Sequence, residues 1–213
     1  MPLHVRRWDL PISTRELGLT RDAYTKSILR DWLRLNMTVT LQSLMASPPD
    51  LQTVVDDFAE YRTEGAVDSL RAYFNQAPTS GFTPGGRRAS HVALVYPRRQ
   101  LLPPVQHIGV VGEGIAGYYL ETFEDLTLMV RPFGLTPDMV LRERSGRRLA
   151  LAEVKTSLQP GRRVFPTPVA IQLLELLAKV KFMRTSRYLA FVVNVSILGL
   201  DEYHLDVLRM AEV

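Results

Sequence analysis

The segment over residues 136–157, TPDMVLRERSGRRLALAEVKTS, constrains the fold of this chain most strongly. Two apolar runs of strand length, residues 139–141 and 149–154, lie on either side of a Ser-Gly dipeptide, which is typical of turns. The segment therefore predicts two β-strands joined by a turn. Because alternate residues of a strand share a face, Glu153 and Lys155 are expected to point the same way.

The charged residues of this segment interrupt a pattern that otherwise predicts burial. Leu-Ala-Leu-Ala-Glu-Val-Lys is apolar enough for a central strand with both faces covered. Asp138 opens the first strand, and Glu153 lies near the end of the second. Two buried carboxylates cost free energy through desolvation and mutual repulsion unless a cation neutralises them. Two interpretations are open: a cation site, or a Glu153–Lys155 salt bridge at a strand end with Asp138 as a solvated turn residue.

The spacing of these residues matches a known motif. Pro137-Asp138 is followed by fourteen residues and then by Glu153-Val154-Lys155. This arrangement resembles the PD-(D/E)XK nuclease superfamily, which includes many restriction endonucleases, Holliday junction resolvases and phage exonucleases. The proline before the aspartate, the hairpin between the two halves, and E-x-K at a strand end all match. The resemblance implies an α/β (α+β) fold with a restriction endonuclease-like core, in which helices flank a mixed central sheet.

The order of the expected elements agrees with this resemblance. Apolar periodicity predicts a helix, three strands, a second helix and a further strand, over residues 109–123, 126–133, 139–141, 149–154, 169–182 and 187–195. Helix–strand–strand–strand–helix–strand is the core order of the superfamily. The resemblance spans residues 109–196 and does not cover residues 1–100. The tail after residue 199 is expected to add a last strand or helix.

The resemblance implies a metal-dependent nuclease that hydrolyses phosphodiester bonds, with DNA favoured over RNA and a role in restriction or defence. Asp138 and Glu153 would bind Mg²⁺ or Mn²⁺ through hard oxygen ligands, with the backbone carbonyl of Val154 nearby. Glu113, in the first turn of the helix before the strands, would complete the metal site, and Glu121 is the alternative. Without a metal, Glu113 would simply complement the helix dipole.

Further residues are expected around this site. Lys155 would orient or deprotonate the attacking water, or contact the phosphate. Gln172 lies early in the second core helix, where some members of the superfamily have a polar site residue. The net charge is +4, and Arg147, Arg162 and Arg163 lie near the motif in sequence, where they would bind flanking phosphates. A solvated, arginine-rich surface is the alternative interpretation.

The first part of the chain has a different pattern. Helical spacing of apolar residues predicts a mostly helical region over residues 1–85, followed by a nuclease-like core over residues 86–213. The Pro- and Gly-rich segment at residues 78–86 separates the two. Within the first region, helical structure is expected over residues 13–35, 39–45, 51–59 and 66–74. This region would serve packing, homodimer formation or substrate positioning, and its first helices resemble a helix-turn-helix only weakly.

Composition excludes several other classes of protein. The chain has no cysteine, which excludes disulfides, thiolate metal sites and a cysteine nucleophile. No apolar run approaches the roughly 20 residues of a membrane span, and no secretory signal is recognisable, so we expect a cytoplasmic protein. The alternative to a nuclease is an inactive nucleic-acid-binding or assembly protein that keeps the nuclease fold. His204 is expected at the surface rather than as a metal ligand.

Overall fold

The computed structural model describes most of the chain outside three long segments, residues 13–37, 77–101 and 159–187. The described residues are 2–12, 38–45, 50–59, 65–76, 102–132, 137–146, 148–158 and 188–212. The helices predicted over residues 13–35 and 169–182 lie outside these ranges, as does the Pro- and Gly-rich segment. The fold is therefore described from the strands and from three helices.

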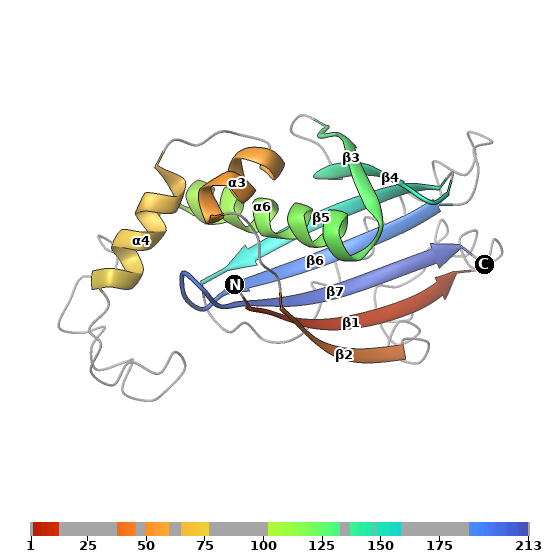
Figure 1. The fold of residues 1–213 in the computed structure, drawn as a ribbon, viewed down its shortest axis with the longest axis horizontal. Coiled ribbons are helices and arrows are strands. Elements are labelled where there is room, and N and C mark those ends of the chain that lie inside the picture. The colour runs from red at the N-terminus through yellow and green to blue at the C-terminus, as the bar shows by residue number, and fades with distance from the viewer. Residues whose placement is uncertain are drawn as a thin grey trace, which may run out of the picture.

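A seven-stranded mixed sheet forms the centre of the fold, in the order β2-β1-β7-β6-β5-β4-β3 (Figure 1). Its strands are β1 (Pro2–Ile12), β2 (Thr38–Met45), β3 (Leu126–Val130), β4 (Met139–Glu143), β5 (Leu149–Ser157), β6 (Tyr188–Ile197) and β7 (Tyr203–Glu212). β5 runs parallel to β6 and β1 parallel to β7, whereas the other neighbouring strands are antiparallel. The prediction of a mixed sheet in an α/β fold is confirmed.

The hairpin of β4 and β5 forms where the sequence predicts it. Its turn is closed by a hydrogen bond from the Glu143 N–H to the Arg148 carbonyl, at 3.0 Å. The Arg148 guanidinium also donates to both carboxylate oxygens of Glu143, and these hydrogen bonds lower the pKa of Glu143. A Cβ on Gly146 would meet that carboxylate, so a glycine lets the chain turn around the ion pair.

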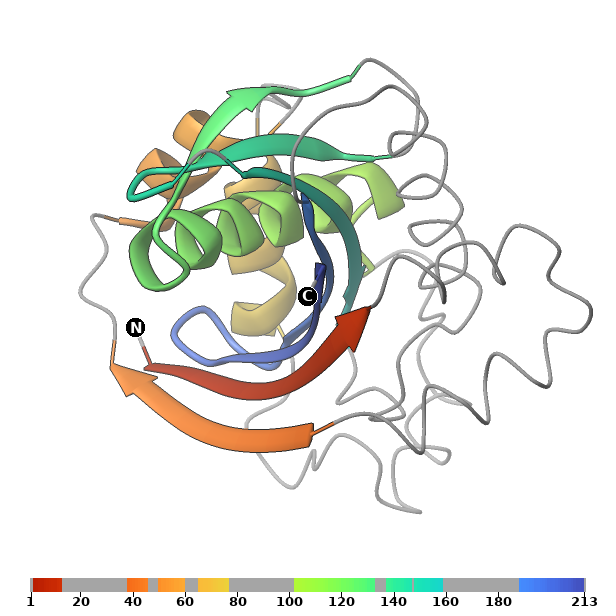
Figure 2. The same cartoon turned by 90° about the vertical axis from the view of Figure 1, so that its right-hand side faces the viewer.

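Three helices, α3 (Leu51–Phe58), α4 (Ala66–Gln76) and α6 (Val105–Phe123), form where helices are predicted. Because α6 begins at Val105 rather than at residue 109, Glu113 lies inside the helix, and the prediction that places it in the first turn is wrong. The Asp50 carboxylate caps α3 by accepting a hydrogen bond from the Thr53 N–H, at 3.0 Å. Figure 2 shows the sheet curving around α6, which contacts β3, β5 and β6. No helix among the described residues is long and apolar enough to cross a membrane.

Close packing between α6 and β5 depends on a glycine. A Cβ built on Gly112 would lie 2.6 Å from the Cβ of Thr156 on β5, closer than real Cβ contacts come. Gly114 similarly lies against the backbone of α3, because its Cβ would be 2.9 Å from the Cα of Val55. At the other end of α6, the Tyr119 hydroxyl donates to Glu124, which also pairs with Arg7 of β1 at 2.8 Å.

The prediction of a mostly helical N-terminal region is wrong where β1 and β2 form. Residues 39–45, expected to be helical, belong to β2, and β1 lies inside the sheet between β2 and β7. A segment as short as this fits a strand as well as a helix, so the pairing partner decides. Here β1 pairs with β2 on one side and with β7 on the other. The sheet thus contains strands from both sides of residue 85.

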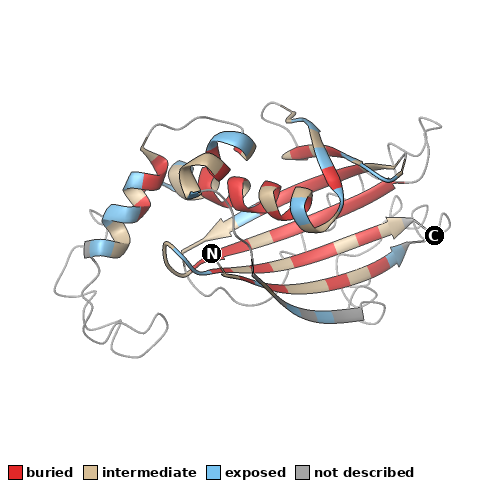
Figure 3. Ribbon diagram, in the orientation of Figure 1, coloured by how far each residue is buried: buried red, intermediate tan, exposed pale blue. Residues whose placement is uncertain are grey.

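The two faces of the sheet carry different side chains. Ala150, Ala152 and Val154 of β5 belong to the same apolar cluster as Val111 and Ile115 of α6. The alternate residues of β5, and their partners on β6, β7 and β1, point away from α6, to a side that we call the far face. β6 is buried at nine of its ten positions, so both of its faces are covered (Figure 3). Glu153 lies on the far face.

Candidate active site on the β4–β5 hairpin

Asp138 lies immediately before β4 and is hydrogen-bonded to the neighbouring strand. Met139 pairs with Ala152, so the antiparallel register, continued by one position, places Asp138 opposite Glu153. The Asp138 Oδ2 atom accepts a hydrogen bond from the Val154 N–H at 2.6 Å. Asp138 is half-buried. Asp138 is therefore tied to β5 rather than being a solvated turn residue.

Glu153 and Lys155 lie side by side on the far face, which confirms that their side chains point the same way. Glu153 is only 4% exposed, and its Oε1 atom lies 2.8 Å from the Lys155 ammonium. The Lys155 side chain is 46% exposed. The salt bridge of the second interpretation is thus present. It satisfies one of the two carboxylate oxygens of Glu153.

The other oxygen of Glu153 bears on whether these residues fit a divalent cation. Its Oε2 atom is buried and accepts no hydrogen bond from the residues that the structure describes. A buried carboxylate oxygen without a donor or a cation is costly. Mg²⁺ and Mn²⁺ prefer oxygen ligands of this kind. Asp138 and Glu153 on neighbouring strands therefore fit a hard divalent cation.

Among the described residues, no third carboxylate joins this pair. Glu113 belongs to α6, which packs on the other face of the sheet. In the described part of the chain, Glu113, Asp138 and Glu153 do not form a trio whose ligand atoms all lie within 4.8 Å of one another. Glu121, the alternative, accepts hydrogen bonds from the Leu128 N–H at 2.7 Å and from Arg144 at 3.3 Å. The Glu121 carboxylate thus has its partners around β3.

Four further residues predicted for the site lie outside the described residues: Gln172, Arg147, Arg162 and Arg163. Their roles stay predictions. Val154, expected to offer its carbonyl to a metal, lies in β5 with its side chain in the core under α6. The peptide of Val154 lies in β5 between Glu153 and Lys155.

A row of polar side chains extends across the far face from Lys155. The ladder places Lys155 beside Asn194 of β6, Asn194 beside Asp206 of β7, and Asp206 beside Arg6 of β1. Arg6 pairs with Asp206 at 2.9 Å and stacks over the ring of Trp8 at 4.4 Å. Sequence reasoning missed this row because nothing local indicates that β1 pairs with β7. Alternating polar residues in β1 and β7 were the available signal.

Comparison with family models, with curated protein sequences and with solved structures found no match to this chain. The function must therefore be inferred from the residues of the site and their geometry.

Proposed function

We propose that this chain is a metal-dependent nuclease that hydrolyses phosphodiester bonds, with DNA as the favoured substrate and restriction or defence as its role. The observation that carries the proposal is the buried Glu153, opposite Asp138 and beside Lys155, with one oxygen that accepts no hydrogen bond from the described residues. The order α6, β3, β4, β5 and β6 also agrees with the core order that the resemblance to PD-(D/E)XK nucleases implies.

The residues of the hairpin divide the chemistry between them. A bound Mg²⁺ or Mn²⁺ would supply Lewis acidity and offset negative charge at the phosphate. Asp138 and Glu153 would hold that ion, with the Val154 carbonyl as a further oxygen. The Lys155 side chain is half-exposed, so it can reach a phosphate or orient the attacking water while it stays near Glu153.

Substrate contacts outside the hairpin are part of the same proposal. Arg147, Arg162 and Arg163 would bind the phosphates that flank the scissile bond, because arginine forms paired hydrogen bonds with phosphate oxygens. A homodimer would place two such sites on one duplex.

A second candidate is a nucleic-acid-binding or assembly protein without nuclease activity. The 2.8 Å contact between Lys155 and Glu153 favours it, because the lysine then serves only as the charge partner of a buried carboxylate. The two candidates differ in what the removal of Lys155 does to cleavage and to stability.

A cleavage assay tests the proposal. Linear, circular and branched DNA and RNA would be incubated with the protein in Mg²⁺ or Mn²⁺, beside Asp138→Asn, Lys155→Ala and Arg71→Ala. Arg71 is a control for lost positive charge, because it is half-exposed on α4 and forms an ion pair with its neighbour Asp68, away from the hairpin. Cleavage by the wild type and by Arg71→Ala, but by neither site variant, is expected. A wild type that cuts no substrate with either ion would refute the nuclease proposal.

A further inference from the structure

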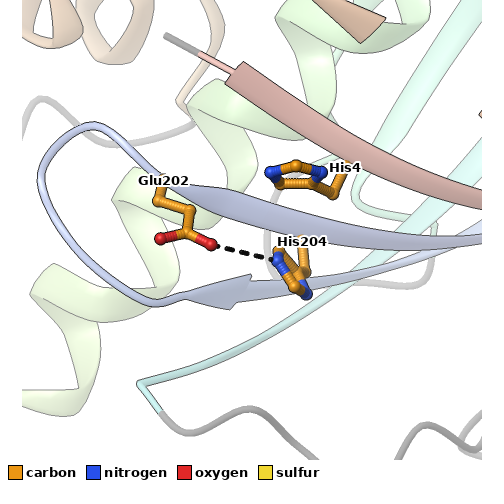
Figure 4. A group of neighbouring side chains, drawn as sticks. All are labelled: His4, Glu202 and His204. Atoms are coloured by element: carbon orange, nitrogen blue, oxygen red, sulfur yellow. Dashed lines mark ion pairs between the residues drawn. The ribbon is translucent and has the colours of Figure 1, made fainter. Parts of the chain in front are cut away.

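Three side chains at one end of β1 and β7 form a second cluster on the far face (Figure 4). His4 of β1 and His204 of β7 are direct partners in the parallel ladder, and their ring centroids are 4.8 Å apart in an edge-to-face arrangement. Glu202 lies just before β7, and its Oε1 atom is 3.4 Å from the His204 Nε2 atom. One ligand atom from each residue lies within 4.8 Å of the other two.

These distances suit a tetrahedral metal ion. Zinc bonds to nitrogen or oxygen are about 2.0–2.2 Å long, which places neighbouring ligand atoms of a tetrahedron about 3.3 Å apart. The Glu202–His204 contact already has nearly this separation. Because His4 shares the register position of His204, rotation of its ring about the side-chain bonds can close the remaining distance.

The backbone beneath the cluster is well anchored. The N–H groups of Leu198 and Gly199 donate to the Glu202 carbonyl at 3.1 and 3.3 Å, which closes the turn between β6 and β7. Tyr203, between Glu202 and His204, is fully buried, and its hydroxyl donates to the Leu200 carbonyl at 2.5 Å. The cluster is also accessible, because His4 and Glu202 are exposed. An ion could therefore enter from solvent without a change in the fold.

We propose that His4, Glu202 and His204 bind a borderline transition metal, with Zn²⁺ as the best fit. Two imidazoles and one carboxylate are a recurrent zinc ligand set, and imidazole distinguishes this site from the all-oxygen pair Asp138 and Glu153. With three protein ligands, one coordination position stays open to water or to a ligand. The ion would also join the N-terminal strand to the β6–β7 hairpin. The inference does not depend on the proposed nuclease function.

Calorimetric titration of the untagged chain with zinc chloride, after treatment with a chelator, tests this site. The wild type should bind one Zn²⁺ at this site. His204→Gln and His4→Gln should each bind zinc at least tenfold more weakly, since even the loss of a group that only supports a metal ligand lowers metal affinity by about 10–100-fold. His107→Gln is the matched histidine control, because His107 contacts Ser69 on the α4–α6 side of the molecule. Glu153→Gln should bind zinc at this site as tightly as the wild type.

Two further measurements identify the ligands independently of affinity. Zinc should shift the imidazole NMR signals of His4 and His204 but not that of His107, and Co²⁺ should give the visible absorption of a tetrahedral, nitrogen-containing site. Zinc should raise the melting temperature of the wild type and leave that of His204→Gln unchanged. A wild type that takes up no zinc, or a folded His204→Gln or His4→Gln protein that binds it equally tightly, overturns the proposal. His4→Gln, at an exposed position, carries the test if His204→Gln does not fold.

Discussion

Replacement of Gly112 by alanine tests the contact between α6 and β5 that positions the candidate site. The new Cβ would lie 2.6 Å from the Cβ and 2.5 Å from the Cγ2 of Thr156. Rotation of the Thr156 side chain can move Cγ2 but cannot move Cβ. Either the helix or the strand must therefore shift. Because Thr156 follows Lys155 directly in β5, the shift would reach the site.

The expected cost combines two opposing terms. Overpacking of a core typically costs about 1–3 kcal/mol, and the short contact with Cβ places this substitution near the upper end. Alanine in place of glycine inside a helix regains about 1 kcal/mol. The net loss is thus about 2 kcal/mol, which lowers the melting temperature of a chain of this size by about 4–8 °C. Gly109→Ala is the matched control in α6, because nothing lies within 4 Å of its Cβ.

Urea and thermal unfolding of the variants check this reasoning. Gly109→Ala should be stabilised by up to about 1 kcal/mol, so the two alanine variants should differ in sign. Thr156→Ala in the Gly112→Ala background should restore only part of the loss, since it removes Oγ1 and Cγ2 but keeps the Cβ. A Gly112→Ala protein as stable as Gly109→Ala would show that α6 and β5 are not in this close contact.

The remaining predictions concern the hairpin. Lys155→Ala should reduce the cleavage rate by about 10²–10⁴-fold and keep the affinity for the metal. Asp138→Asn should lose both cleavage and metal binding. Cleavage rates and calorimetric titration with Mn²⁺ separate the two cases. If Lys155→Ala melts far lower and the wild type binds no Mn²⁺, the second candidate function is favoured. Arg148 lowers the pKa of Glu143 in the folded protein. The ionised carboxylate therefore contributes its full stability at pH values above the unfolded pKa of about 4.3. This contribution is lost as the pH falls through the lower pKa of the folded state. Glu143→Gln should therefore cost up to about 1 kcal/mol at pH 7 and almost nothing at pH 2, and an equal cost at both pH values in urea melts would contradict this.

Local patterns were enough to predict the elements that carry their own signals. The turn in the β4–β5 hairpin and the apolar periodicities of α3 and α6 are all encoded within a few residues, and these elements form where predicted. The same-face placement of Glu153 and Lys155 follows from the geometry of any strand. These features needed no knowledge of distant partners.

Tertiary structure alone decided the position of the N-terminal strand and the clusters built on it. Residues 39–45 and β1 mix polar and apolar residues, so their state depends on pairing, and β1 pairs with residues 200 positions away in β7. That parallel register brings His4 to His204 and Arg6 to Asp206. The tertiary structure also decided where Glu113 lies. Glu113 belongs to α6, which covers the face of the sheet opposite Glu153. The side of the sheet that a helix covers is set by chain connection and packing rather than by local sequence.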